Sequence, residues 1–309
     1  MITDNIIQLI GNTPMLRASN FAARMGSDIA PLAKLEYLNP AGSIKDRTAL
    51  SMIEDAERQG ILKPGATIIE PTSGNTGVGM SMICAVKGYR LILTMPDTMS
   101  MERINLLRAH GAEVVLTDGT KGMDGAVAES EKLKNEIDGA VILGQFVNPA
   151  NPLAHYTSTA EEIWADTQGK VDAVIAGIGT AGTLCGIGKR LKELNPKVKI
   201  IGVEPASSPL ITKGVSGPHK LQGIGANFIP KIYDANVVDC VEAITNEDAI
   251  TASRLFAQTE GILIGYTGGA ALVCAIKVIK ENPSFKNVVA ILPDGGERYL
   301  STDLYHDQQ

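Results

Sequence analysis

The chain has 309 residues, of which 44% are hydrophobic and 20% are charged, and its net charge is −6. This composition is typical of a globular protein of one or two domains and excludes a disordered chain. The acidic balance argues against binding to nucleic acid or to an anionic membrane, and no apolar run reaches the roughly 18 residues of a membrane span. The N-terminus lacks the pattern of a signal peptide, so we expect a cytoplasmic protein.

Short β-branched runs alternate with helical stretches along most of the chain. Several strands are apolar at consecutive positions, as in strands that are buried on both faces of a parallel sheet. The alternation predicts βαβ units and a doubly wound α/β fold. Strand runs are predicted within 66–71, 90–96, 112–119, 171–179, 199–205 and 287–299, and helices follow the first four at 73–88, 100–111, 122–137 and 183–196. A further helix, capped by Thr245 or Asn246 and ended by Gly261, is predicted at 245–261.

The cysteines and histidines suggest no metal site. Cys84, Cys185, Cys240 and Cys274 lie far apart in the chain, and the histidines show no ligand spacing. In a reducing compartment, such cysteines are usually small buried hydrophobic residues. We therefore predict neither a metal site nor a disulfide.

The first loop with chemical potential follows the strand at 66–71. Thr72, Ser73, Gly74, Asn75 and Thr76 lie between this strand and a helix, where backbone N–H groups and hydroxyls can hold an anion. The loop contains no lysine, so it is not a Walker-type nucleotide loop. A carboxylate fits it better, while good helix capping alone would also explain its Ser, Asn and Thr residues.

The second loop carries a phosphate pattern. Gly177, Gly179 and Gly182 match G-x-G-x-x-G after a strand, and Glu204 ends the next strand. That spacing is typical of a dinucleotide site, so an NAD-dependent oxidoreductase stays open as an alternative. Thr180 and Thr183 add hydroxyls, which suit a terminal phosphate monoester.

Lys45 lies at the start of a predicted helix, after the small residues of "NPAGS". Helix N-termini and burial would both lower the pKa of such an amine and make it a nucleophile. A neutral amine, a phosphate loop, a carboxylate loop and the hydroxyl of Thr267 in a glycine-rich turn would together suit a phosphorylated aldehyde such as pyridoxal 5'-phosphate.

The motifs "PAGSIKDR", "EPTSGNTG", "QFVNPANP", "GIGTAGT" and "GIGANFIP" resemble the O-acetylserine sulfhydrylase (cysteine synthase) family, which also includes the cystathionine β-synthases. The resemblance runs from Gly11 to Thr302. It implies a fold type II pyridoxal-phosphate enzyme with two doubly wound, mostly parallel-sheet domains and the cofactor in the cleft between them. One domain would span 36–148 and include a mobile subdomain near 94–113. The other would span 1–35 and 149–309, with the boundary in the proline-containing segment 147–159.

The resemblance also implies roles for individual residues. Lys45 would form the internal aldimine and act as the base, and Ser73 would share in catalysis. Cofactor contacts would come from Asn75, Gly179, Thr180, Ala181, Gly182, Thr183 and Thr267. Substrate contacts would come from Thr72, Ser73, Gly74, Asn75, Thr76, Gln145, Gly223 and Asn227. The implied reaction converts O-acetyl-L-serine and sulfide to L-cysteine and acetate through an aminoacrylate.

Three positions depart from the family pattern. Ala181 replaces a glycine in the phosphate loop, and its methyl group is costly if φ is positive. Tyr266 replaces a modest aliphatic residue. Asn227 stands where sulfhydrylases carry glycine and cystathionine β-synthases carry aspartate, so a cystathionine-forming enzyme and a cysteine lyase that releases hydrogen sulfide stay open as alternatives. The resemblance also implies a homodimer and docking of a serine acetyltransferase C-terminal tail.

Overall fold

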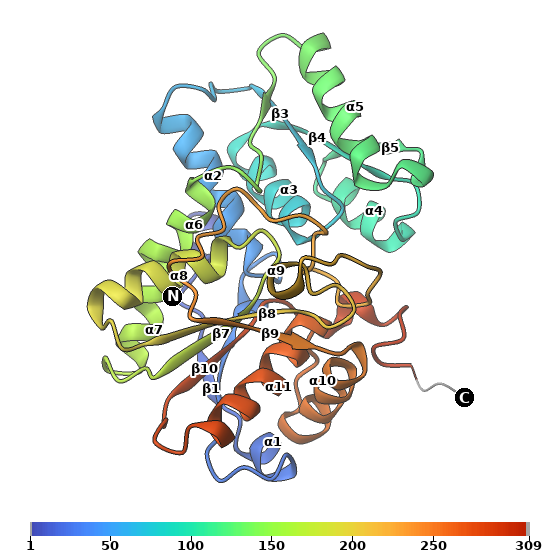
Figure 1. The fold of residues 1–309 in the computed structure, drawn as a ribbon. Helices are drawn as coiled ribbons and strands as arrows, with labels where there is room; N and C mark the ends of the chain where they lie inside the picture. Colours follow the sequence, from blue (N-terminus) through green and yellow to red (C-terminus); the bar gives the residue numbers. More distant parts are fainter. Residues whose placement is uncertain (1, 307–309) are drawn as a thin grey trace. The chain divides into compact units, whose positions relative to one another are not determined.

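The computed structural model describes residues 2–306, and the chain forms two compact units (Figure 1). One unit contains the chain up to Ile10 and Lys45–Asn151, and the other contains Gly11–Ile44 and the chain from Pro152 onward. No helix in the described part of the chain is long and apolar enough to cross a membrane.

The first unit is built on a parallel four-stranded sheet in the order β5-β4-β3-β6. Burial along its central strands is nearly continuous, as the apolar sequence runs predict. Its elements are η1 (Ile6–Leu9), α2 (Lys45–Arg58), β3 (Thr67–Pro71), α3 (Asn75–Lys87), β4 (Arg90–Pro96), α4 (Met101–Ala109), β5 (Glu113–Thr117), η3 (Gly119–Lys121), α5 (Gly122–Glu136) and β6 (Val141–Ile142).

The strand order fixes which helices share a face of this sheet. The chain advances from β3 to β4 to β5 and then returns across the sheet to β6. Right-handed crossovers therefore place α3 and α4 on one face and α5 on the other. α2 packs against α3 and joins the first layer.

The second unit contains a six-stranded sheet in the order β1-β2-β10-β7-β8-β9, in which only the β1–β2 pair is antiparallel among the described strands. Its elements are β1 (Met15–Arg17), α1 (Ser19–Arg24), β2 (Leu32–Leu35), η2 (Glu36–Leu38), the π-helix η4 (His155–Thr159), α7 (Ala160–Asp166), β7 (Ala173–Gly177), α8 (Gly182–Leu194), β8 (Lys199–Pro205), α9 (Leu210–Lys213), β9 (Cys240–Ile244), α10 (Asn246–Glu260), α11 (Tyr266–Glu281), β10 (Val288–Leu292) and η5 (Gly296–Tyr299).

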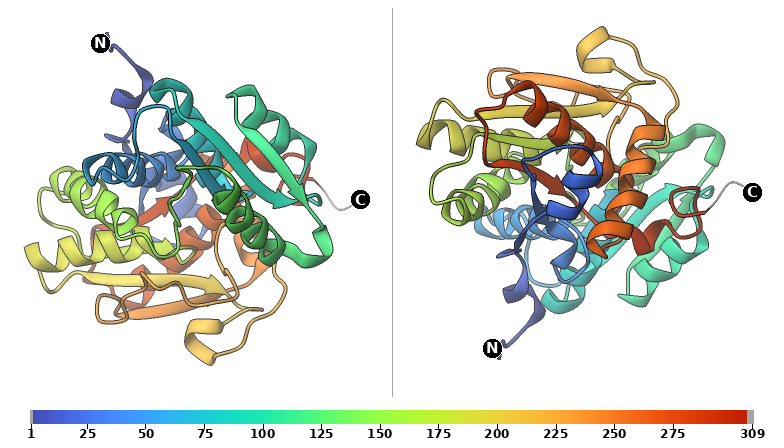
Figure 2. Two further views of the ribbon diagram at one scale, coloured as in Figure 1. Left: turned by 90° about the horizontal axis from the view of Figure 1, so that it is seen from above. Right: turned by 90° about the horizontal axis from the view of Figure 1, so that it is seen from below.

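Two apolar layers cover this sheet. α10 and α11 pack together on one face with α1, and α7 and α8 lie on the other (Figures 1 and 2). The first layer is built around Phe21 and Phe256, whose rings pack edge to face with their centroids 5.7 Å apart. The second layer is built around Leu184, Ile187 and Leu191. Each layer buries the apolar stripe of its helices, which is what drives a doubly wound unit to form.

The unit boundaries differ from the predicted domain boundaries at both ends of the first unit. Residues 36–44 belong to the second unit, because Ser43 pairs with Asp294 and Ile44 N–H donates to the carbonyl of Pro293. The chain up to Ile10 belongs to the first unit, where η1 contacts α3. The change of unit after Asn151 lies inside the segment 147–159, where we expected a boundary.

The proline-containing segment 147–159 is helical from Ala150, with α6 (Ala150–Ala154) leading into η4, because Pro152 lies in the first turn, where proline is tolerated. One sequence expectation needs correction. Cys240 is exposed at the start of a strand, while the other cysteines are buried. The short strands β1, β2, β6 and β9 were not predicted.

Ala181 has a left-handed backbone. It is the N-cap of α8, with φ +70° and ψ −7°, and its side chain is 3% exposed. A Cβ atom in this conformation crowds the following carbonyl oxygen, at a cost of roughly 1–2 kcal/mol. The departure from the glycine of the family pattern therefore falls on a position where glycine is the less strained residue.

We predict that Ala181→Gly raises the free energy of unfolding by about 1 kcal/mol, because the relief of strain exceeds the entropy that a glycine adds to the unfolded chain. Denaturant unfolding monitored by circular dichroism measures the change. Gln168→Gly removes the same kind of strain at an exposed residue, since Gln168 also has a positive φ, +54°. A less stable Ala181→Gly protein would contradict the assignment of strain to this residue.

Candidate functional site

The helices that carry the predicted site residues begin without a side-chain cap. α3, α8 and α11 follow Gly74, Ala181 and Gly265, and none of these residues has a side chain that can accept a hydrogen bond from the first turn. By contrast, Ser100 caps α4, and Thr245, one of the two predicted candidates, caps α10. The N–H groups at an uncapped helix start remain available to an anionic ligand.

The loop Thr72–Thr76 presents such donors in the first unit. Thr72 and Thr76 are buried at its two ends, and Ser73, Gly74 and Asn75 are partly exposed between them. Thr72 is fixed by its N–H, which donates to Thr94 O at 3.1 Å, and its Oγ1 accepts from Gly74 N–H at 3.3 Å. The rigid ends hold the exposed centre of the loop in one conformation.

Gln145 lies against this loop. The Thr76 hydroxyl donates to Gln145 Oε1 at 2.6 Å, and both side chains are buried. Because Oε1 is taken, the Gln145 amide presents its N–H₂ group as the free donor. The Thr72 hydroxyl and the Gln145 N–H₂ group are thus neighbouring neutral donors suited to a carboxylate, with Thr76 holding Gln145 in place.

Lys45 begins α2 and is partly buried. α3 approaches α2 closely there, since a Cβ atom on Gly79 would lie 3.1 Å from Lys45 O and 3.2 Å from Asp46 Cα. Glycine at position 79 therefore permits the contact between the two helices. Lys45 and the loop Thr72–Thr76 stand at the N-terminal ends of two packed helices of the same unit.

Glu70 contacts the backbone of Gln145, and the sequence analysis did not identify it. It is 1% exposed, and its carboxylate accepts the N–H groups of Gly144 at 2.9 Å and Gln145 at 3.1 Å. Burial raises the pKa of Glu70, and the backbone donors, including that of Leu143, oppose the rise. A charged residue at the end of an otherwise apolar strand was the available signal.

The glycine-rich loop Gly177–Thr183 of the second unit joins β7 to α8. A Cβ atom on Gly179 would overlap the carbonyl oxygen of Gly223, so the loop needs glycine there. Thr180 and Thr183 are both buried, at 5% and 7% exposure. The uncapped α8 and these hydroxyls make an arrangement of donors that fits a phosphate group.

His155 supports this loop and was not predicted to do so. Its ring is fully buried in the π-helix η4, with Nδ1 3.0 Å from Thr159 Oγ1 and Nε2 3.3 Å from Thr183 Oγ1. π-Helical turns are frequent at functional sites. No spacing in the sequence points to this histidine, because Thr183 lies 28 positions away in the chain.

Thr267 is at the start of α11 and 6% exposed. Its hydroxyl donates to Gln222 O at 3.0 Å, beside Gly223, so the bond ties α11 to the segment that contacts the glycine-rich loop. The oxygen of Thr267 keeps acceptor capacity, but its proton is already engaged.

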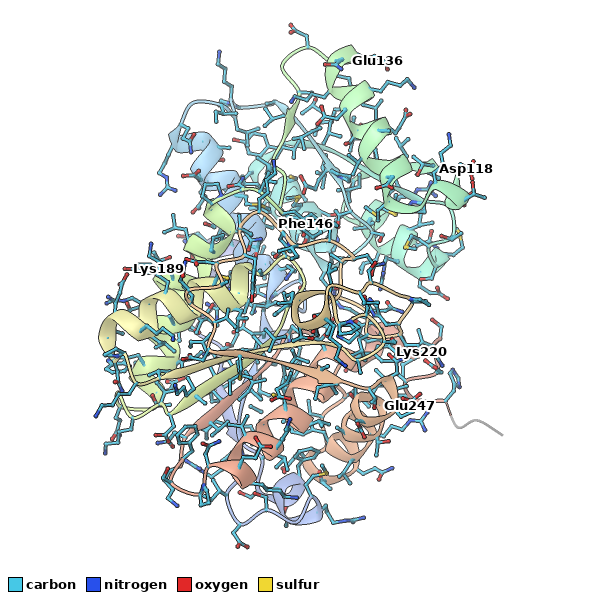
Figure 3. All side chains as sticks on the ribbon, in the orientation of Figure 1. Asp118, Glu136, Phe146, Lys189, Lys220 and Glu247 are labelled. Atoms are coloured by element: carbon cyan, nitrogen blue, oxygen red, sulfur yellow. The ribbon has the colours of Figure 1, made fainter. Side chains whose placement is uncertain are left out.

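Tyr266, the first residue of α11, is linked to Lys220 through Asp303. Its hydroxyl donates to Asp303 Oδ1 at 2.5 Å, and Asp303 also pairs with Lys220, which is labelled in Figure 3. Burial and the Asp303 carboxylate raise the pKa of Tyr266 to about 12, while Lys220 and then Tyr266 lower the pKa of Asp303. The departure at 266 thus replaces an aliphatic contact with a polar link.

Asn227 is exposed in a left-handed conformation, with φ +61°. This geometry explains why glycine and asparagine both suit the position, because asparagine tolerates it better than most residues. The Ser208 hydroxyl donates to Asn227 Oδ1 at 3.0 Å and in turn accepts Gly217 N–H at 3.1 Å. The amide of Asn227 is therefore oriented by its neighbours.

Glu204 does not serve the dinucleotide alternative. Its carboxylate is 2% exposed and accepts the N–H groups of Ile211 at 2.8 Å and Thr212 at 3.2 Å, together with the hydroxyl of Thr212. It caps the short helix α9, so it is not available to a ribose hydroxyl.

Comparison with known proteins agrees with these features. The chain matches the family of pyridoxal-phosphate-dependent enzymes over residues 6–294. It is 50% identical to a cysteine synthase of Staphylococcus aureus over 303 residues, which cover 98% of this chain and 97% of the relative.

Solved structures of similar proteins share the fold. A cysteine synthase from Entamoeba histolytica superposes with a TM-score of 0.95 at 43% identity, covering 100% of this chain and 93% of that one. A hydrogen sulfide-producing enzyme from Fusobacterium nucleatum has a TM-score of 0.92 at 45% identity, covering 97% and 99%. The chain therefore belongs to the family of pyridoxal-phosphate-dependent enzymes.

Proposed function

We propose that the protein is an O-acetylserine sulfhydrylase, a cysteine synthase that converts O-acetyl-L-serine and sulfide to L-cysteine and acetate. Its full-length identity of 50% to a cysteine synthase carries this conclusion. The presence of a carboxylate cluster, a lysine and a phosphate loop in the same chain agrees with it. Formation of L-cysteine by the purified protein from these two substrates is the direct test.

The residues present fit pyridoxal 5'-phosphate. The uncapped start of α8 with Gly179, Thr180, Ala181, Gly182 and Thr183 offers N–H and hydroxyl donors for its phosphate. Gly179 is required by the close approach of the Gly223 backbone, which shapes this loop. Lys45 supplies the amine, and we assign Asn75 and Thr267 to the ring of the cofactor.

When bound, the cofactor supplies an aldehyde that captures amines and a ring that accepts the electrons of a carbanion at Cα. Lys45 Nζ would hold the cofactor in the resting enzyme and take the proton from Cα of the substrate. Thr267 would place a neutral hydroxyl at the ring. A neutral partner favours substrates with a good leaving group on Cβ, such as acetate, because charge on the ring need not accumulate.

The carboxylate of the amino-acid substrate would bind at Thr72, Ser73, Gly74, Thr76 and Gln145. The first turn of α3 adds the positive end of a helix dipole, equivalent to about half a charge. Fixing the carboxylate orients Cα toward the lysine of the same unit, and we also assign Ser73 a share in catalysis. These neutral donors bind the carboxylate without adding a cation that would compete for the cofactor phosphate.

Gly223 and Asn227 would contact the incoming nucleophile. A polar amide at 227 favours a second ligand with a carboxylate or water over bare sulfide. One structural neighbour is a hydrogen sulfide-producing enzyme, so release of sulfide from cysteine is a second candidate activity. Formation of cystathionine, with a thiol amino acid as the nucleophile, is the other candidate that the amide would favour.

The assembly and location of the protein are also proposals. We propose a homodimer in the cytoplasm, which sedimentation of the purified protein and cell fractionation would test. Binding of a serine acetyltransferase C-terminal tail is a further proposal, and a pull-down with such a tail peptide would test it. Such a tail ends in a carboxylate, which the donors around Gln145 would bind.

We predict that Lys45→Ala abolishes cysteine formation and the visible absorption of the covalently held cofactor. Lys45→Arg should do the same, because it keeps the charge but loses the nucleophilic amine. The exposed Lys63 provides the control, since Lys63→Ala should keep both properties. Wild-type activity in the Lys45→Ala protein would contradict the mechanism.

We predict that Gln145→Ala weakens binding of O-acetyl-L-serine by roughly 1–3 kcal/mol, the value of one hydrogen bond to a charged group. The change in the cofactor spectrum on addition of substrate measures the Kd. Gln59→Ala removes an exposed glutamine of the same unit and should leave the Kd unchanged. If the Gln145→Ala protein binds substrate as tightly as wild type, the carboxylate assignment is wrong.

We predict that Asn227→Gly keeps the fold, because its positive φ suits glycine, and shifts the preference of the enzyme toward sulfide over bulkier thiols. The ratio of rates with sulfide and with L-homocysteine measures the shift. Ser208→Ala releases the amide without removing it and should give a smaller change. Equal ratios in the Asn227→Gly and wild-type proteins would remove Asn227 from the nucleophile site.

A further inference from the structure

Every polar group of Gln145 except its N–H₂ is already bonded within the first unit. Its backbone N–H donates to Glu70, its side-chain oxygen accepts from Thr76, and its backbone carbonyl accepts from Asn151 Nδ2 at 2.8 Å. Among the hydrogen bonds of residues 2–306, none uses Nε2 of Gln145. The residue is therefore held at three points and offers one donor group to a ligand.

Asn151 extends this contact to another element. Its Oδ1 accepts the hydroxyl of Thr48 at 3.3 Å, and Thr48 lies one turn into α2, which begins at Lys45. Asn151 is 1% exposed and Thr48 is fully buried. The side chain of Asn151 thus spans from the backbone of Gln145 to the helix of the lysine, with both its donor and its acceptor side engaged.

The segment between Gln145 and Asn151 is itself rigid. Asn148 N–H donates to Gly144 O, and Asn151 N–H donates to Asn148 O, so a short turn connects the two residues, beside Phe146 in Figure 3. Ser51 of α2 also donates to Ala150 O at 2.7 Å. Movement of α2 would therefore be transmitted to Gln145 through fixed bonds.

We propose that Asn151 is a positioning residue. It holds Gln145 in place to bind the substrate carboxylate and fixes the position of Gln145 relative to α2, the helix that begins at Lys45. This inference rests on the proposed function, which assigns the carboxylate to Gln145 and the amine chemistry to Lys45. Asn151 acts through Gln145 and does not touch the substrate.

The test measures recognition of the carboxylate in the holoenzyme without turnover. L-Alanine and L-alaninamide share an amine and a methyl group, but only the first has a carboxylate, and neither has a leaving group on Cβ. Calorimetric titration gives the Kd of each probe. We expect Asn151→Ala to weaken L-alanine about tenfold, equivalent to roughly one hydrogen bond to a charged group, and to change L-alaninamide by less than about twofold.

Asn148→Ala is the matched control. Asn148 lies in the same segment and makes the same kinds of hydrogen bond. Its Nδ2 donates to Leu143 O, and its Oδ1 accepts the N–H of Ala150, but it does not bond to Gln145. It should leave the ratio of the two Kd values unchanged. A loss that is equal for both probes in the Asn151→Ala protein, or an equal loss in both asparagine variants, would overturn the proposal.

Two further variants keep the test decisive if Asn151→Ala fails to fold. Thr48→Val conserves shape and removes the hydroxyl that donates to Asn151, and it should weaken L-alanine selectively by about two- to fivefold. An unchanged ratio in that protein would overturn the proposal. When Thr48→Val is combined with Gln145→Ala, it should add no further selective loss, since Thr48 acts only through Gln145.

The same experiment separates the two proposals. If Gln145→Ala itself leaves the ratio unchanged, the carboxylate assignment of the proposed function fails. If Gln145→Ala removes the discrimination but Asn151→Ala and Thr48→Val do not, only the role of Asn151 fails.

Discussion

The arrangement of this molecule depends on helix N-termini that the chain leaves uncapped. A helix start normally has its orphan N–H groups satisfied by a Ser, Thr, Asp or Asn side chain, as at Ser100 and Thr245. At α3 and α8 the preceding residues are Gly74 and Ala181, which cannot do this. At α8 the Thr180 hydroxyl accepts the N–H of Gly182 at 3.4 Å, and the remaining donors and the helix dipole are left for an anion, as they are at α3 in the other unit. The missing side-chain caps lower the stability of these helix starts, which are the positions where a carboxylate and a phosphate would bind.

Positive φ angles occur at the start of α8 and in the segment 223–227. Ala181 has a positive φ directly before α8, and Asn227 has one in the segment that also contains Gly223 and Gly225. Residues in this conformation persist when their surroundings fix them. Here those surroundings are the bond from Gly225 N–H to Ile178 O and the contact of Gly179 with Gly223 O. The glycine-rich loop and the 223–227 segment therefore hold each other in shape.

The sequence predicted the long regular elements and the loops, but not the partners of buried polar groups. Apolar runs at 66–71 and 199–205 correspond to β3 and β8, because burial on both faces leaves a clear pattern. The two-residue strand β6 is too short to leave one. The bonds of His155 to Thr183 and of Asn151 to Gln145 depend on how the chain folds in space, and no spacing reports them. The same holds for Tyr266, whose link to Asp303 explains a departure that the sequence could only note.

Glu70 and Glu204 show why local sequence could not settle their roles. Each lies just before the proline that ends a buried parallel strand, and each carboxylate accepts two backbone N–H groups, those of Gly144 and Gln145 for Glu70 and those of helix α9 for Glu204. A charge at the end of such a strand needs several donors, and backbone N–H groups supply them without adding a countercharge. Glu204 thereby fixes α9, whereas Glu70 fixes the peptide of Gln145. The same device is structural in one unit and bears on the candidate site in the other, and only the residue that it holds distinguishes the two cases.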